Sequence, residues 1–155
     1  MLFRSVWMTN EKIRPILIQL LNDTPVLTLA HHNSIMTKLP HDSTRTFWHQ
    51  DRRYWNFEND NLVSVWLALG DEYLDRFDSE SNFLDENSEN IELIHQRTSN
   101  NLQKGDVVLF HCKTLHHASK NHSDKAKISF VYTVRAKSNN PIKGTRSDFK
   151  EVILD

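Results

Sequence analysis

The sequence LVSVWLAL at residues 62–69 is an apolar run that lies between the polar pairs Asp60-Asn61 and Gly70-Asp71. A short run of β-branched and large apolar side chains with turn-forming residues at both ends is typical of a buried β-strand. This run therefore predicts a strand inside the protein, and the elements on either side of it indicate how that strand is covered.

Shorter β-rich runs lie on both sides of this strand, and one helical pattern precedes them all. Apolar residues recur at intervals of three and four between Ile13 and Leu21, which predicts an amphipathic helix capped by Thr9 or Asn10. One leading helix followed only by strands favours a β-sandwich or a jelly roll. Besides 62–69, the predicted strands are residues 25–30, 32–38, 46–51, 91–95, 106–111 and 128–134.

The composition is that of an ordinary globular domain, and we expect one domain over residues 1–155. Of the 155 residues, 38% are hydrophobic and 25% are charged, which is too apolar for a disordered chain. The net charge of −1 argues against a nucleic-acid-binding protein with a basic surface.

The sequence also indicates a compartment. No apolar segment is long enough to cross a membrane, and residues 1–10 lack the basic and apolar regions of a secretory signal. The single cysteine, Cys112, cannot form an internal disulfide and fits a reducing compartment. We therefore expect a cytoplasmic protein that binds neither nucleic acid nor a membrane.

Two segments have opposite charge biases. Residues 71–90 contain eight acidic residues and one basic residue, Arg76, which predicts a solvated loop or lid. Residues 113–146 contain eight basic residues and one acidic residue, Asp124. Either both segments are solvated surfaces whose charges cancel, or the second is a basic floor that receives an anionic ligand.

His49-Gln50-Asp51 is the candidate metal-binding motif. On a strand over residues 46–51, side chains two residues apart share a face, so His49 and Asp51 should lie together. A histidine and a carboxylate are two of the three ligands in the facial triad that holds non-haem Fe(II) and leaves open positions. With nine histidines in the chain, roughly one His-x-Asp triplet is expected by chance, so the motif needs its context. His111, His116 and His117 are the candidates for the third ligand.

Four blocks of sequence supply that context: WHQDRRYW at 48–55, LVSVWLAL at 62–69, GDVVLFH at 105–111 and LHHASKN at 115–121. In this order they resemble the phytanoyl-CoA dioxygenase family, and the similarity runs from about Leu27 to Arg135. The resemblance implies a mainly β fold, a double-stranded β-helix (a cupin-like jelly roll) with an N-terminal helix. It also implies an Fe(II)- and 2-oxoglutarate-dependent dioxygenase that consumes O2.

The resemblance assigns residues to the iron. His49 and Asp51 match the first two ligands of the family. The distal histidine of the family lies in a Leu-His-Gly/His-Ser/Ala stretch before an asparagine, which selects His116 over His117 in this chain. The implied catalytic metal site is therefore His49, Asp51 and His116. We expect His111 to be an ordinary strand residue and the remaining histidines to be peripheral, namely His31, His32, His41, His95 and His122.

The resemblance also assigns residues to the cosubstrate. In the family, a basic residue about eleven positions after the distal histidine binds 2-oxoglutarate, and Lys127 is the match here. Lysine offers a single cation in place of the planar fork of the usual arginine. Ser129 shares the strand face of Lys127, and Trp66 and Lys38 match residues that line the same pocket. Arg135 is the rival candidate for binding the distal carboxylate.

The implied reaction hydroxylates a C–H bond of a small organic or acyl substrate. Asp51 argues against a halogenase, in which this carboxylate is missing so that chloride can bind. The substrate stays open, because no basic groove for a CoA thioester is evident. Two other functions stay open as well: a degenerate, non-catalytic jelly-roll module that binds a metal or a partner, and a zinc hydrolase, which would need a general base near the metal.

The chain departs from the family pattern in two places. After Glu72, the family continues into a glycine-containing segment that ends near Pro-Gly-Ser-His, whereas here Tyr73-Leu74 run directly into Asp75-Arg76-Phe77. Family members also usually carry more helical chain before the point where Met1 stands. Either the chain is a shortened relative of the family, or residues have been lost from the sequence. If the segment is truly absent, we expect an incomplete barrel that has lost one strand and has an open edge to cover, which would put activity in doubt.

Overall fold

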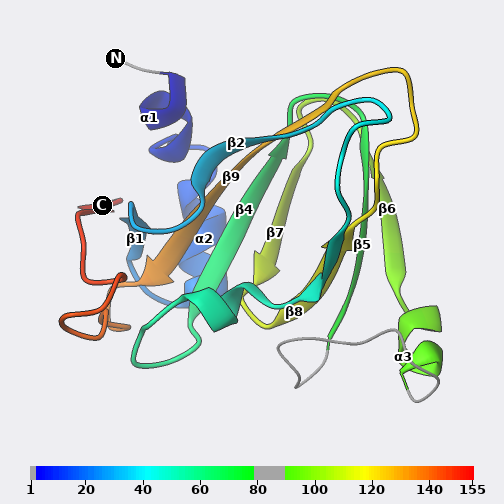
Figure 1. Ribbon diagram of the computed structural model, residues 1–155. Helices are drawn as coiled ribbons and strands as arrows, with labels where there is room; N and C mark the ends of the chain where they lie inside the picture. Colours follow the sequence, from blue (N-terminus) through cyan, green and yellow to red (C-terminus); the bar gives the residue numbers. More distant parts are fainter. Residues whose placement is uncertain (1–2, 79–89) are drawn as a thin grey trace.

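The structure, a computed structural model, describes residues 3–78 and 90–155 (Figure 1). Its helices are α1 (Phe3–Met8), α2 (Arg14–Leu21), the 3-10 helix η1 (Asp51–Tyr54) and α3 (Ile91–His95). No helix in these two ranges is long and apolar enough to span a membrane. The strands are β1 (Pro25–Thr28), β2 (Asn33–Lys38), β3 (Thr46–His49), β4 (Leu62–Ala68), β5 (Glu72–Asp78), β6 (Thr98–Leu102), β7 (Val107–His111), β8 (Thr114–Ala118), β9 (Lys127–Ala136) and β10 (Glu151–Ile153).

The strands form two antiparallel sheets. The six-stranded sheet has the order β10-β1-β9-β4-β7, with β2 also paired to β9, and the four-stranded sheet has the order β3-β8-β5-β6. From β2 to β9, the neighbours are therefore β2-β9-β4-β7 in one sheet and β3-β8-β5-β6 in the other (Figure 1). This interleaving of early and late strands in two sheets is that of a jelly roll, so the predicted fold class is confirmed.

The prediction of a lost strand was wrong. β5 begins soon after Gly70 and pairs with β6 on one side and β8 on the other, so the four-stranded sheet has no gap at this place. The order β2-β9-β4-β7 is likewise complete in the other sheet. The chain therefore builds both layers of the jelly roll without the glycine-containing segment of the family.

The same strand corrects the predicted acidic loop over residues 71–90. Residues 72–78 are strand, Asn90 directly precedes α3, and residues 79–89 lie outside the described residues. Acidic residues are compatible with an antiparallel strand that has one face in water, so composition alone could not separate a loop from a strand. Hydrogen bonding of the backbone to two neighbouring strands decides in favour of β5.

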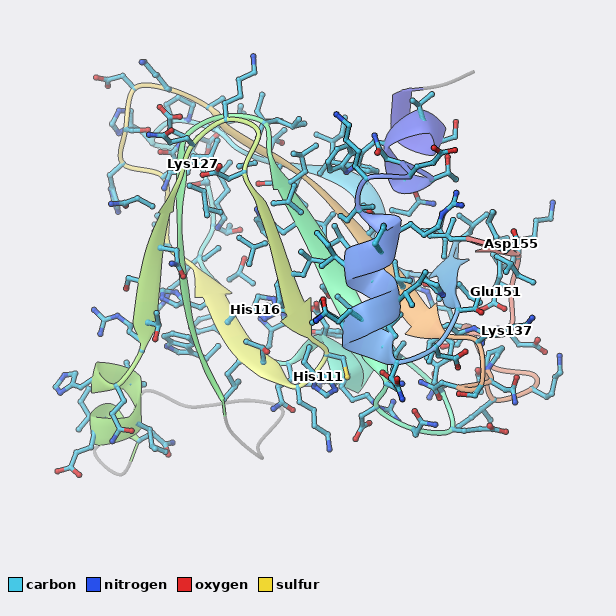
Figure 2. The ribbon with its side chains drawn as sticks, turned by 180° about the vertical axis from the view of Figure 1, so that it is seen from behind. His111, His116, Lys127, Lys137, Glu151 and Asp155 are labelled. Atoms are coloured by element: carbon cyan, nitrogen blue, oxygen red, sulfur yellow. The ribbon has the colours of Figure 1, made fainter. Side chains whose placement is uncertain are left out.

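β4, the strand predicted from LVSVWLAL, lies between β9 and β7 and has two different faces. Val63, Val65 and Leu67 belong to a buried cluster with Leu17 and Leu21 of α2, and Figure 2 shows α2 lying across this side of the sheet. Apolar residues of β9 complete the cluster, among them Phe130, Tyr132 and Val134. The alternate residues of β4, which include Ser64 and Trp66, face the other sheet. That inner face contributes to the candidate site.

The helices differ from the prediction in their limits and number. α2 begins at Arg14 with Ile13 at its N-cap, and Pro15 lies in the first turn, where a missing backbone N–H costs nothing. The predicted strand over 91–95 is helix α3, whose Ile94 packs against Trp48 and Leu115. α1 and the strands β6, β8 and β10 were not predicted as separate elements.

Candidate functional site

His49, Asp51 and His116 lie together where β3 ends beside β8. His49 is the last residue of β3 and is paired in register with His116 of β8, and the centroids of the two rings are 4.3 Å apart. Asp51 Oδ1 lies 3.7 Å from His49 Nε2 and 3.6 Å from His116 Nε2. All three potential ligand atoms fall within 4.8 Å of one another, a group that could hold a metal ion.

The local backbone differs from the continuous strand that was predicted over residues 46–51. β3 stops at His49, Gln50 is extended, and Asp51 opens the 3-10 helix η1. The side chain of Gln50 is buried and donates a hydrogen bond to the carbonyl of Lys113, away from the ligand group. His49 and Asp51 therefore share a side, as predicted, although only His49 belongs to the strand.

Backbone carbonyls orient both imidazoles. His49 Nδ1 is 2.8 Å from the carbonyl oxygen of Phe47, and His116 Nδ1 is 3.0 Å from that of Thr114. A ring that donates from Nδ1 keeps the lone pair of Nε2 free for a metal, and such carbonyl partners are the usual second-shell contacts of metal-binding histidines. Burial lowers the pKa of His116, although the Asp51 carboxylate acts in the opposite direction. The neutral form that binds a metal is thereby favoured.

The Asp51 carboxylate provides the test of whether a cation fits here. Its side chain is 1% exposed, and Oδ2 accepts a hydrogen bond of 2.6 Å from Ser64 Oγ. Oδ1 has no hydrogen-bond partner among the described residues. Because a buried carboxylate oxygen without a partner is costly, a cation between Oδ1 and the two Nε2 atoms would satisfy all three groups. The donor set of two imidazoles and one carboxylate suits Fe(II).

The two other candidates for the third ligand do not join this group. The ring of His117 packs against Trp48, with 4.1 Å between the centroids. His111 is exposed at the end of β7, where its Nδ1 accepts a hydrogen bond from the backbone N–H of Lys113 (Figure 2). Of the three histidines, only His116 places a ring nitrogen beside Asp51 in the described part of the chain.

His32 was expected to be peripheral, and that expectation was wrong. It lies between β1 and β2, and its Nε2 is 3.6 Å from Asp51 Oδ1, the same distance as His116 Nε2. Its φ of 24° falls in the left-handed region, which costs a residue other than glycine about 1–3 kcal/mol. The sequence carries no signal for this position, because His32 lies outside all four blocks of family similarity.

A cavity of about 540 Å³ joins the ligand group to the predicted cosubstrate residues. Lys127 and Lys38 are paired in register on β9 and β2, and Ser129 and Trp66 also line the cavity. Lys38 Nζ donates to the carbonyl oxygens of Thr44 and Ala118, while burial, together with the charge of Lys127, lowers the pKa of Lys38. Lys127 has no hydrogen-bond or ion-pair partner among the described residues. All seven predicted site residues thus border one space.

Arg135, the rival to Lys127, lies at the opposite end of β9. Its guanidinium forms two hydrogen bonds with the Glu151 carboxylate, of 2.7 and 2.6 Å, and also donates to the carbonyl oxygens of Ala136, Lys137 and Asn139. Figure 2 shows Glu151 far from Lys127, on the other side of the molecule. In the described ranges, Arg135 does not line the cavity. Its hydrogen bonds to Glu151 join β9 to the C-terminal strand β10.

A comparison of sequences identifies the family. The sequence model of the phytanoyl-CoA dioxygenase (PhyH) family matches residues 2–76 and 70–129. The chain belongs to this family. A search of curated proteins found no significant match.

Several solved structures share the jelly roll of this PhyH-family chain. They include the apo form of the non-heme monooxygenase ThoJ (TM-score 0.76, 15% identity, 97% of this chain and 60% of that chain). EctD from S. alaskensis with bound Fe has a TM-score of 0.75 and 18% identity, over 90% of this chain and 54% of that chain. The alpha ketoglutarate dependent carbocyclase SnoK from nogalamycin biosynthesis has a TM-score of 0.71 and 18% identity, over 93% and 62%. The chain therefore spans 54–62% of the length of these structures.

Proposed function

We propose that this PhyH-family chain is an Fe(II)- and 2-oxoglutarate-dependent oxygenase and that it hydroxylates a small organic or acyl substrate. The observation that carries the proposal is the convergence of His49 Nε2 and His116 Nε2 on Asp51 Oδ1, a buried oxygen without a hydrogen-bond partner among the described residues. When bound by these three residues, Fe(II) supplies open coordination positions at which 2-oxoglutarate and O2 react.

The protein's part in this chemistry is to orient, to neutralise charge and to exclude water. The carbonyls of Phe47 and Thr114 fix the two imidazoles, and Ser64 fixes the carboxylate. Such hydrogen bonds keep the ligands in place before a metal arrives, so little reorganisation is needed on binding. With Asp51 and His116 almost fully buried, bulk water has little access to the ligand atoms.

Lys127 is the proposed partner of the distal carboxylate of 2-oxoglutarate. It lines the same cavity as the ligand group and has no ion-pair partner among the described residues, whereas the hydrogen bonds of Lys38 to two carbonyls hold Lys38 in the cavity wall. The two lysines make this end of the cavity positive, which suits a dianionic cosubstrate. Ser129 and Trp66 contribute a hydroxyl and an apolar surface to the same pocket.

The size of the cavity supports a small substrate. About 540 Å³ is within the usual range for a small-molecule site, and most of a CoA group would lie outside it. Related folds carry different chemistry: ThoJ is described as a monooxygenase, SnoK as a carbocyclase and SnoN as an epimerase. Because related folds differ in their reactions, hydroxylation is our proposal for this chain. We also propose a cytoplasmic location and one oxygenase-like domain over residues 1–155.

The non-catalytic module is the weaker alternative. Its main support was the expected loss of a strand, and β5 fills that place between β6 and β8. The two functions differ in whether 2-oxoglutarate is consumed. We expect the Fe(II)-loaded protein to convert 2-oxoglutarate to succinate in the presence of O2 and a substrate, and the Asp51→Ala variant not to do so. Tight Fe(II) binding without a 2-oxoglutarate-dependent absorption band under argon would instead support the non-catalytic module.

A further inference from the structure

We propose that His32 is a fourth, exchangeable protein ligand of the metal, bound while the cosubstrate is absent and displaced when 2-oxoglutarate binds. This inference rests on the proposed metal site of His49, Asp51 and His116 and adds a residue to it. His32 would then occupy one of the positions that 2-oxoglutarate and O2 need, so that the metal has fewer open positions in the resting protein.

The ring nitrogens of three histidines lie at similar distances from Asp51. The Nε2 atoms of His32, His49 and His116 lie 3.6, 3.7 and 3.6 Å from the same oxygen, Asp51 Oδ1. Metal–ligand bonds of about 2.0–2.2 Å place neighbouring ligand atoms about 3.0–3.5 Å apart, so each of these three distances to Oδ1 exceeds that of two ligands on one metal by only a few tenths of an ångström. By its distance to Asp51 Oδ1, His32 matches the two histidines of the triad, but it lies outside the group of ligand atoms within 4.8 Å of one another, so its ring must shift further than theirs when a metal binds.

The backbone at His32 places its ring in the lining of the cavity. His32 has a φ of 24°, and its ring meets the buried Trp55 edge-on, with 5.6 Å between the centroids and an interplanar angle of 81°. The preceding residue, His31, does not line the cavity, and its Nε2 is hydrogen-bonded to Ser147 Oγ at 2.7 Å. A strained backbone conformation that turns one side chain into a cavity is a frequent feature of ligand-binding sites.

His32 is held less firmly than the other two histidines, so it would be the ligand that exchanges. His49 and His116 each donate from Nδ1 to a backbone carbonyl, whereas His32 Nδ1 is buried and has no hydrogen-bond partner among the described residues. Donation from Nδ1 strengthens an imidazole as a ligand and fixes its orientation. The side chain of His32 is also 20% exposed, against 12% for His49 and 8% for His116. We therefore expect His32 to be the weakest of the three imidazole ligands.

Cu(II), added in one equivalent to the metal-free protein, is the probe, because pulsed EPR counts the imidazoles that bind it. We expect three imidazoles in the wild type and two in His32→Asn, with Cu(II) affinity lower by about tenfold. Asparagine accepts left-handed backbone, so this variant should keep the fold. The control is His41→Asn, which makes the same change at another residue with positive φ (57°) whose ring is outside the cavity lining. It should keep three imidazoles.

Addition of 2-oxoglutarate to the wild-type Cu(II) complex should reduce the count from three imidazoles to two. Two imidazoles in both the wild type and His32→Asn would overturn the inference and leave the triad intact. The His49→Ala variant distinguishes a failure of the proposed metal site from a failure of the inference about His32. If it binds Cu(II) as tightly as the wild type does, the proposed metal site itself fails.

Discussion

The rings of His49 and His116 face each other across the β3–β8 pairing, and both Nε2 atoms lie within 3.7 Å of Asp51 Oδ1. This pairing joins two histidines that are far apart in the sequence, so the metal site depends on the register of the four-stranded sheet. β5, on the other side of β8, holds that strand in place. The metal site and the completeness of the jelly roll are therefore linked.

Ser64→Ala should weaken metal binding without touching a ligand. Ser64 Oγ donates to Asp51 Oδ2 at 2.6 Å, and loss of such a second-shell contact typically costs about 10–100-fold in affinity. Fe(II) titration under argon measures the effect. Ser129→Ala is the matched control, since Ser129 is buried like Ser64 but lines the cavity, and it should retain wild-type affinity. Equal affinities for Ser64→Ala and the wild type would show that this contact does not position Asp51.

Lys127→Ala should weaken 2-oxoglutarate binding by roughly thirtyfold or more, because it leaves the distal carboxylate without its cation. Lys127→Arg should retain part of the affinity, since the charge remains but the planar fork must fit a pocket shaped for lysine. The charge-transfer band of the anaerobic Fe(II) complex reports the affinity. Fe(II) binding itself should survive in both variants. Wild-type 2-oxoglutarate affinity in Lys127→Ala would remove Lys127 from the proposal.

Arg135→Ala should affect stability rather than the cosubstrate. The Arg135 side chain is 8% exposed and bound to Glu151, and removal of one member of a buried ion pair typically costs about 3–5 kcal/mol of unfolding free energy. Urea denaturation should show this loss, and 2-oxoglutarate affinity should be unchanged where the variant is folded. A selective loss of 2-oxoglutarate binding would instead restore Arg135 as the residue that binds the cosubstrate.

The pH dependence of stability should contain a contribution from His31. Burial, with smaller effects from Arg146 and His32, lowers the pKa of His31 from 6.5 to about 4. Between these values the unfolded chain binds a proton at His31 that the folded protein does not, so the unfolding free energy should fall as the pH drops from 6.5 towards 4. Burial also lowers the pKa of His116, which adds to the same trend.

His31→Gln isolates the share of His31, because His116 is present in both proteins. Urea denaturation of the metal-free forms at about pH 5 and about pH 7 should show a smaller difference for the variant than for the wild type. An equal difference in the two proteins would mean that His31 does not titrate differently on folding.

Much of the fold and site could be predicted because the relevant signals are local. LVSVWLAL is apolar except for Ser64 and has turn residues on both sides, and β4 spans 62–68, close to the predicted 62–69. His49 and Asp51 are two residues apart, and their side chains lie on the same side of the chain as predicted, even though η1 replaces the end of the predicted strand. The order of the four blocks then indicated His116, which the register of β3 and β8 places opposite His49.

The remaining features depend on contacts between distant segments. β5 is a strand because β6 and β8 lie on both sides of it, and its acidic sequence does not encode those neighbours. The segment 91–95 forms helix α3, whose Ile94 packs against Trp48 and Leu115. A five-residue apolar pattern cannot predict these contacts. His32 lies at the site because its backbone has a positive φ and its ring packs against Trp55. No spacing of residues in the sequence predicts that conformation.

Fe(II) titration under argon of five proteins tests the central claim most directly. We expect about one equivalent of Fe(II) to bind to the wild type and to His117→Ala, because the ring of His117 packs on Trp48 rather than beside Asp51. His49→Ala, Asp51→Ala and His116→Ala should each lose stoichiometric binding, since the proposed exchangeable ligand His32 is too weak to replace a member of the triad. Equal losses in His116→Ala and His117→Ala, or full binding by Asp51→Ala, would contradict the account.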